Sequence, residues 1–487
     1  MGADLGGIEA RELFDEADAP MTVADVGLKI EAVKPPVNPL LSAPILPTLV
    51  RLSLPNMLAM VASALVAVAE TAYVGQLGTP ALAGLALVFP MVMLMGMMSA
   101  GAMGGGVSSA ISRALGAGEE ARASSLAMHA VVIGTLAGLL FTALLLIFGE
   151  RIYAALGGRG AALAQAVLFS NVVFTGALGV WLTNTLASVV RGGGNMKVPS
   201  LTLFLAAAAQ ALLGGVLGLG LMGFPKWGMA GVALGFVITQ SAAAAFLLWY
   251  LASGRARVRL NLRQVSLNRE MFFDILKVGG VALLSPVQSV LTVLVLTKLV
   301  SSFGTEALAG YGIGARLEFL LIPIAFGIGV ACVPMVGMAV GAGQVQRARR
   351  VAWTGGLMAA VLVGGVGVLV ALFPDAWARL FTTEPKVLEA AASYFAWAGP
   401  CYPLFGLGLC LYFASQGSGK MWGPVLAGTL RLVVVAIGGW WLTTWASPVW
   451  MIFALVGLAM AAYGLGTVAA VYWVSWEPVG KARGVAP

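Results

Sequence analysis

Long apolar stretches, separated by short polar ones, follow one another from residue 46 to residue 474. A helix that crosses a bilayer needs about 20 mostly apolar residues, and twelve of the stretches reach that length. We predict membrane helices at 46–75, 80–112, 123–148, 162–190, 199–222, 229–252, 276–301, 306–338, 351–373, 389–415, 424–446 and 450–474. Because their number is even, both ends of the chain are expected on the same side of the membrane.

The polar connections between these helices differ in charge on the two sides. On one side, basic residues occur in connections at 116–124, 191–199, 255–264, 341–350, 416–424 and 479–484. The other side has only Arg151, Arg159, Lys226, Arg379 and Lys386. Basic loops remain in the cytoplasm, so we expect a multi-pass protein of the bacterial plasma (inner) membrane with both termini cytoplasmic. We call the side with the basic connections the basic end.

Composition supports the membrane assignment and separates off the start of the chain. The 487 residues are 60% hydrophobic and 10% charged. Residues 1–44 hold eight acids and three bases, and are expected to form a disordered acidic cytoplasmic tail. The rest of the chain has 25 basic and 12 acidic residues. Membrane topology explains this excess, so no nucleic-acid partner is expected.

An internal repeat organises the chain. "GTPALAG" at 78–84 recurs as "GTEALAG" at 304–310, and "RGGGNMKVP" at 191–199 recurs as "QGSGKMWGP" at 416–424. A third match, "GAG", recurs in the same order, and all three are offset by 225 or 226 residues. Six helices and their connections are therefore predicted to be duplicated.

The duplication predicts the domain boundaries. We expect an all-α membrane protein with two pseudo-symmetric six-helix bundles around a central cavity. The predicted parts are the tail 1–44, a first bundle 45–252, a cytoplasmic connection 253–275, a second bundle 276–476 and a C-terminal tail 477–487. Because each bundle has an even number of helices, the repeats are parallel, and sites in such transporters lie near the midplane between them.

Several stretches together resemble the multidrug and toxic compound extrusion (MATE) transporters. They are "LPNMLAMVASALVAVAETAYVGQLG", "ISRALGAGEEARA", "RGGGNMKVP", "GMAGVALG" and "GTEALAG…VGMAVGAG", within about residues 46–476. The resemblance is closest to the bacterial DNA-damage-inducible-type subgroup. It implies alternating access and efflux of organic cations driven by H⁺ or Na⁺, with no cofactor.

Only two acidic residues outside the tail are predicted deep in the membrane, Glu70 and Glu318. Glu70 lies eight residues before Gly78, about 12 Å along a helix, so its side chain is expected to face the protein interior or a wet cavity. Removal from water favours the neutral form of a carboxyl group. Glu70 is therefore a candidate to bind and release a proton, the alternative being a permanently protonated residue hydrogen-bonded to a neighbour.

The MATE resemblance adds residues around Glu70. Family members usually carry Asp at this place, and many have a nearby proline, matched here by Pro55, which is a candidate hinge or a simple kink. Some members add an Asn and an Asp, which correspond here to Gln210 and Gly214. Since this second acid is missing, a single carboxyl group favours H⁺. Thr71 and Gln210 still offer oxygen atoms, so Na⁺ stays an alternative.

The second half does not repeat Glu70, because the offset of 226 places Leu296 there. It has Glu318 instead, interpreted either as a coupling residue or as a structural tie between helices. Arg316, two residues away, points to a different face. Arg316 and Gln288 are expected at the substrate cavity, and Arg191 near a cytoplasmic helix end is expected to be a surface anchor.

The segment 90–106 is rich in methionine. Met91, Met95 and Met98 share one face of a regular helix, where they are interpreted either as a drug-facing surface or as ordinary packing. The glycines that follow lie inside a helix, which favours close helix packing over a nucleotide-binding loop.

The leading hypothesis is a monomeric secondary exporter that takes small lipophilic cations and contacts membrane lipids. A flippase for lipid-linked precursors is a second transport hypothesis. An enzyme is not expected, because the membrane segments have no deep histidine, paired carboxylates or metal-ligand pattern. A channel is disfavoured because the two halves are not equivalent.

Overall fold

The computed structural model describes residues 39–260, 267–445 and 447–476. The chain divides into the units Met1–Ser42 and Ala43–Pro487. Within the first unit only the short helix α1 (Pro39–Ser42) is described, and all the other described helices belong to the second unit. Residues 1–38 of the predicted acidic tail, the C-terminal tail 477–487 and residues 261–266 of the predicted connection lie outside the described residues.

Most of the described residues are helical, because a chain in lipid must satisfy its backbone polar groups internally. The first repeat contains α2 (Ile45–Gly75), α3 (Thr79–Gly96), the π-helical segment η1 (Met97–Met103), α4 (Gly104–Gly116), α5 (Glu120–Ala155), α6 (Gly160–Thr175), α7 (Ala177–Gly192), α8 (Lys197–Leu219), the short η2 (Leu221–Gly223) and α9 (Gly228–Ala252).

The second repeat contains α10 (Arg269–Ala282), α11 (Leu284–Ser301), α12 (Thr305–Gly341), α13 (Val345–Leu372), α14 (Pro374–Ala378), α15 (Pro385–Ala398), η3 (Gly399–Cys401), α16 (Tyr402–Ser418), α17 (Trp422–Thr444) and α18 (Val449–Trp473). In the described part of the chain, 11 helices are long and apolar enough to cross a membrane. The pair α6 and α7, bent by 46°, makes a twelfth. The prediction of twelve membrane helices is confirmed.

The repeat is visible in backbone conformation. Gly78 and Gly304 precede α3 and α12 with φ angles of 110° and 112°. Gly194 and Gly419, in the connections after α7 and α16, have φ angles of 89° and 81°. Only glycine adopts such angles readily, so the glycines of the repeated motifs mark equivalent turns.

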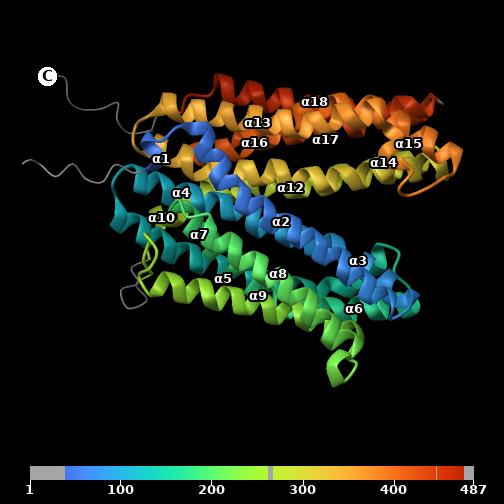
Figure 1. The fold of residues 1–487 in the computed structure, drawn as a ribbon, viewed down its shortest axis with the longest axis horizontal. Helices are drawn as coiled ribbons and strands as arrows, with labels where there is room; N and C mark the ends of the chain where they lie inside the picture. The colour runs from blue at the N-terminus through green and yellow to red at the C-terminus, as the bar shows by residue number, and fades with distance from the viewer. Residues whose placement is uncertain (1–38, 261–266, 446, 477–487) are drawn as a thin grey trace, which may run out of the picture. The chain divides into compact units, whose positions relative to one another are not determined.

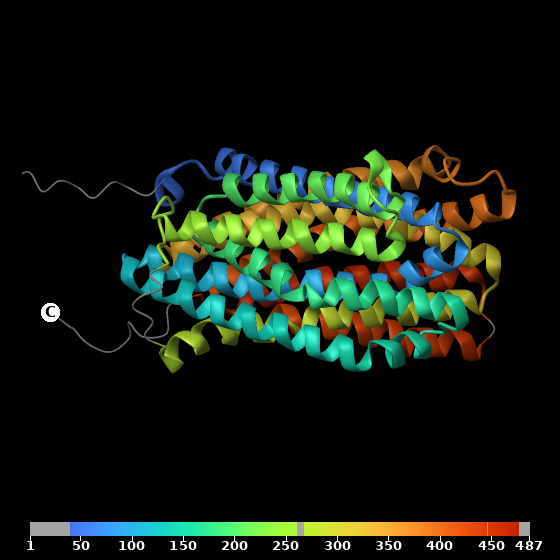
Figure 2. The ribbon, with the colours of Figure 1, turned by 90° about the horizontal axis from the view of Figure 1, so that it is seen from below.

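The helices of each repeat gather into a bundle. In Figure 1, α13, α16, α17 and α18 lie together, and α5, α6, α8 and α9 form a separate group. Figure 2 looks along the direction that separates the two groups, so they overlap in that view. Helices α2, α4 and α12 lie between these groups and contact both bundles. The predicted all-α architecture with two six-helix bundles is confirmed.

Helices α4 and α12 cross at the basic end, where the bundles touch backbone to backbone. A Cβ atom added to Gly341 would meet the carbonyl oxygen of Arg113 and lie 2.9 Å from its carbonyl carbon. A Cβ atom added to Gly116 would meet the carbonyl oxygen of Met338 and lie 2.8 Å from its carbonyl carbon. The two contacts are related by the repeat offset of 225, so the pseudo-twofold axis passes through this crossing.

Each repeat also sends its first helix toward the other bundle. The first half of α2 packs on α12, where Met57 fills the space beside Gly327. Conversely, α10 packs on α4, η1 and α5, and Met103 lies beside Gly279. The bundles are therefore closed against each other at the basic end, where α2 and α10 each pack on helices of the other bundle.

Candidate functional site

Glu70 lies near the end of α2 that is opposite the basic end. The helix ends at Gly75, so Glu70 is five residues, about 7.5 Å, from that end. The amide Nε2 of Gln210 donates a hydrogen bond of 2.5 Å to Oε1 of Glu70. Gln210 is 8% exposed, whereas Glu70 is partly exposed. Helices α2 and α8, which pack together, thus place one carboxyl group beside one amide, as the MATE resemblance implies.

Thr71 does not join this pair. Its side chain is exposed, and its hydroxyl donates to the carbonyl oxygen of Ala67, 2.8 Å away on the same helix. Successive residues of a helix point about 100° apart, which turns Thr71 away from Glu70. Gly214 brings no side chain, and the described residues form no group of three or more His, Cys, Asp or Glu that could hold a metal ion. Glu70 is therefore a single carboxyl group.

Pro55 lies inside α2, and the helix continues through it. The next residue, Asn56, is buried, and its Oδ1 accepts a hydrogen bond of 3.3 Å from Nη2 of Arg191. The expectation that Arg191 is a surface anchor is wrong, because its side chain is only 4% exposed. The end of α7 lies under α4, where Gly192 contacts Ile111, and so Arg191 does not reach the membrane surface.

Glu318 belongs to a separate polar cluster in the second bundle. It accepts a hydrogen bond from the hydroxyl of Tyr394. Tyr402 and Arg431 are further neighbours of this carboxyl group. Helices α12, α15, α16 and α17 thus meet at Glu318. The spacing of the tyrosines along the sequence gives no signal of this meeting.

Arg316 and Gln288 lie apart from Glu318. Arg316 is exposed, with its guanidinium 5.0 Å from the centre of the Phe381 ring. No ion pair within the described residues joins Arg316 to Glu318. Gln288 donates a hydrogen bond of 2.8 Å from Nε2 to the hydroxyl of Thr429, which ties α11 to α17.

The methionine face is interrupted. Met95 is fully buried, whereas Met91 and Met98 are partly exposed. Met98 lies in the π-helical segment η1, whose wider turn rotates the residues that follow relative to a regular α-helix. Sequence spacing alone does not reveal this change of register.

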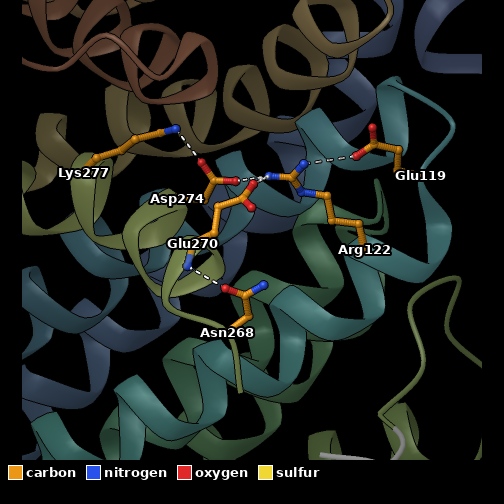
Figure 3. Close-up of polar contacts among 6 residues, drawn as sticks. All are labelled: Glu119, Arg122, Asn268, Glu270, Asp274 and Lys277. Atoms are coloured by element: carbon orange, nitrogen blue, oxygen red, sulfur yellow. Dashed lines mark hydrogen bonds and ion pairs between the residues drawn. The ribbon is translucent and has the colours of Figure 1, made fainter. Parts of the chain in front are cut away.

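An ionic cluster at the basic end was not predicted (Figure 3). Arg122 of α5 forms ion pairs with Asp274, with Glu270 at 3.1 Å and with Glu119 at 3.5 Å. Asp274 also pairs with Lys277 at 2.5 Å. We call these five residues the basic-end cluster. It links α5 of the first bundle to α10.

A histidine reinforces this link. Nε2 of His129 accepts a hydrogen bond of 2.8 Å from the backbone N–H of Asn268, and its Nδ1 lies 2.8 Å from the carbonyl oxygen of Ser125. One neutral tautomer, with the proton on Nδ1, satisfies both contacts. The side chain of Asn268 in turn caps α10 by accepting from the N–H of Glu270 at 2.9 Å.

Comparison with known proteins gives consistent matches. The MatE family model matches residues 55–216 and 282–441. A probable multidrug resistance protein NorM of Thermotoga maritima is 28% identical over 344 residues, which cover 70% of this chain and 73% of that protein. An FAD transporter of Shewanella oneidensis is 26% identical over 377 residues, covering 77% and 82%.

A solved structure shares the fold. It is a transporter of the MOP superfamily from Pyrococcus furiosus, described with a binding pocket of reverse polarity. The TM-score is 0.81 at 23% identity, with 89% of this chain and 96% of that chain covered. MatE proteins are transporters rather than enzymes and need no cofactor. The finer subgroup assignment stays a prediction. The two matched segments fall in the two bundles, and this multi-pass membrane protein belongs to the MatE family.

Proposed function

We propose that this protein is a secondary active multidrug exporter that exchanges organic cations for protons by alternating access. The relative from Thermotoga maritima, named as a probable multidrug resistance protein, supports drug export. We further propose that the protein is a monomer surrounded by the lipid of a bacterial inner membrane. Both of its termini are proposed to lie in the cytoplasm.

The observation that carries the proposal is the Glu70–Gln210 pair. Among the described residues, the Glu70 carboxyl group makes no other hydrogen bond, so an ionised Glu70 is free to attract a cation. A proton from outside neutralises the carboxylate and favours release of the cation. A one-for-one exchange of a proton for a monovalent cation moves no net charge, so the pH gradient drives it.

A proton suits this site better than sodium. Sodium is held by several oxygen atoms, and Gln210 presents its amide N–H rather than its oxygen to Glu70. Thr71 bonds to its own helix. A Na⁺-coupled exporter of the same fold is the alternative.

The remaining candidate residues take secondary roles in this proposal. Glu318 is a second ion-coupling group, and its carboxyl group accepts a hydrogen bond from the hydroxyl of Tyr394. Pro55 is the hinge of α2, because a proline removes one backbone hydrogen bond of the helix. Residues proposed to line the substrate cavity are Met91, Met98, Gln288 and Arg316, whereas the fully buried Met95 is assigned to packing.

The test replaces Glu70 with Gln and follows uptake of a cationic dye into inverted vesicles, in which export by the protein moves the dye into the lumen. Glu70→Gln is expected to abolish dye uptake driven by an acidic lumen in sodium-free buffer, with normal expression. Glu150→Gln, at an exposed site in α5, is the matched control and is expected to transport normally. Retained transport by Glu70→Gln refutes the coupling role.

The ion-substitution arm separates the alternatives. Efflux that needs sodium and ignores a pH gradient identifies the Na⁺-coupled alternative. A flippase for lipid-linked precursors is identified when the protein translocates labelled lipid but no cationic dye.

A further inference from the structure

Arg191 is a buried cation without an acidic partner. None of the ion pairs among the described residues includes it. Its Nη2 donates to the neutral side chain of Asn56, and its Nε has no hydrogen-bond acceptor in the described part of the chain. An uncompensated charge inside a protein is costly, so this position calls for a negative partner.

Arg191 lines a small cavity between the two bundles. Gly105, Ser108 and Arg191 form one wall, and Val330, Val333 and Phe413 of the second bundle form the other. The space open to the centre of a water-sized molecule is about 10 Å³. A space of this size is about the minimum that holds one water molecule, so an occupant slightly larger than water requires the side chains that line it to move outward a little.

Comparison of the two repeats shows that the polar groups of the cavity come from one bundle only. The offset of 225 maps Ser108 onto Val333 and Arg191 onto Gln416. The cavity therefore lies on the pseudo-twofold axis, but the first bundle alone supplies a hydroxyl and a charge. Gln416 directs its Nε2 to the carbonyl oxygen of Gly101, 2.9 Å away. A packing role shared by both repeats does not explain this asymmetry.

The unsatisfied groups near Arg191 are mostly donors. Besides Nε of Arg191, the hydroxyl of Ser108 and Nδ2 of Asn56 are buried without a partner among the described residues. One acceptor, Oε1 of Gln416, lies near Gly105. Buried polar groups are almost always hydrogen-bonded, and an anion accepts from several donors while cancelling the positive charge.

We propose that this cavity binds a single small inorganic anion of the chloride type, held by Arg191 and Ser108. Because the walls come from both bundles, the bound anion stabilises the arrangement closed at the basic end. Asn56, which holds Arg191, directly follows Pro55, so the site adjoins the proposed hinge of α2. This site is neither the proposed proton site nor the substrate site.

The first experiment measures thermal unfolding of the full-length purified protein in chloride, bromide or gluconate at constant ionic strength. The midpoint is expected to rise with chloride to a plateau, and bromide is expected to replace chloride. Equal midpoints in chloride and gluconate overturn the proposal.

Variants locate the effect. Arg191→Gln is expected to remove the chloride dependence. Ser108→Ala is expected to raise the half-saturating chloride concentration several-fold. Ser63→Ala is the matched control, because the Ser63 hydroxyl donates to Ala59 of its own helix at 3.0 Å. If Arg191→Gln does not fold, the proposal is still tested by comparing the chloride response of Ser108→Ala with that of Ser63→Ala. An unchanged chloride response in Ser108→Ala overturns the assignment.

Crystals grown in bromide provide the direct test. An anomalous peak within hydrogen-bonding distance of Arg191 is expected, and a water molecule alone at that place overturns the proposal. Glu70→Gln is expected to keep the chloride response, since Glu70 does not line the cavity. Failure of proton-coupled export is thereby distinguished from failure of the anion site.

Discussion

The crossing of α4 and α12 makes a sharp prediction about the closed arrangement. Gly341→Ala adds a Cβ atom 2.9 Å from the carbonyl carbon of Arg113 and still closer to its oxygen. Both atoms belong to the backbone and cannot rotate away. The substitution is therefore expected to force the two bundles apart at the basic end.

The magnitude follows from the cost of overpacking. An extra methyl group in a well-packed contact costs about 1–3 kcal/mol, and this cost applies only while α4 and α12 touch. A transporter whose second state opens here loses that much from the closed state alone. The ratio of open to closed molecules is then expected to rise roughly 5- to 150-fold.

The assay measures the distance between two spin labels at Ala117→Cys and Ala342→Cys. These exposed positions flank the crossing and are equivalent in the repeat. Cys332, Cys401 and Cys410 are replaced first, so that only the introduced cysteines are labelled. The longer-distance population is expected to increase in Gly341→Ala.

Gly312→Ala is the matched control in the same helix, because no residue of another helix lies within 4 Å of a Cβ atom added there. It is expected to leave the distance distribution unchanged. Gly116→Ala, which meets the backbone of Met338, is expected to act like Gly341→Ala. A folded Gly341→Ala protein with the wild-type distribution refutes the reasoning.

Two further predictions concern ionic and polar clusters. Asp274→Asn removes the group that bridges Arg122 and Lys277, and is expected to lower the free energy of unfolding by about 1–2 kcal/mol, since Asp274 is mostly buried and Arg122 partly exposed. Lys277→Gln removes only an ion pair within one helix, and is expected to lower the free energy of unfolding by about 0.2–0.5 kcal/mol. Chemical unfolding in detergent measures both variants, and a larger loss in Lys277→Gln than in Asp274→Asn contradicts the prediction. Tyr394→Phe and Glu318→Gln are expected to be non-additive by at least about 0.5 kcal/mol, because they remove the two ends of one partly buried hydrogen bond. An additive double mutant contradicts that expectation.

The helices and the repeat could be predicted because both depend on local pattern. A bilayer requires long apolar runs, and the repeated glycines recur at equivalent turns with φ angles of 110° at Gly78 and 112° at Gly304. The pairing of Glu70 with Gln210 could be anticipated through the MATE resemblance.

Other features depend on packing between distant segments. Arg191 looks like a residue at a helix end, but α4 covers it and the second bundle closes over the adjoining cavity. Asp274 looks like a solvated helix-end acid, yet α10 crosses to the first bundle and meets Arg122. Neither position carries a sequence signal that distinguishes it from a surface charge.

The two repeats share the glycines at their packing contacts but do not share the charged residues Glu70 and Arg191. This difference indicates separate roles for the shared glycines and for the unpaired charged residues. Gly116 and Gly341 are equivalent and make equivalent contacts, whereas Glu70 and Arg191 have no charged counterparts. Rocking of two similar bundles needs contacts that both bundles share. A response to one ion or solute needs a group present once, since a paired group would act on both bundles alike. Substitutions at paired glycines should therefore shift the conformational equilibrium in the same direction, while substitutions at the unpaired charges should alter ion dependence without an equivalent in the other half.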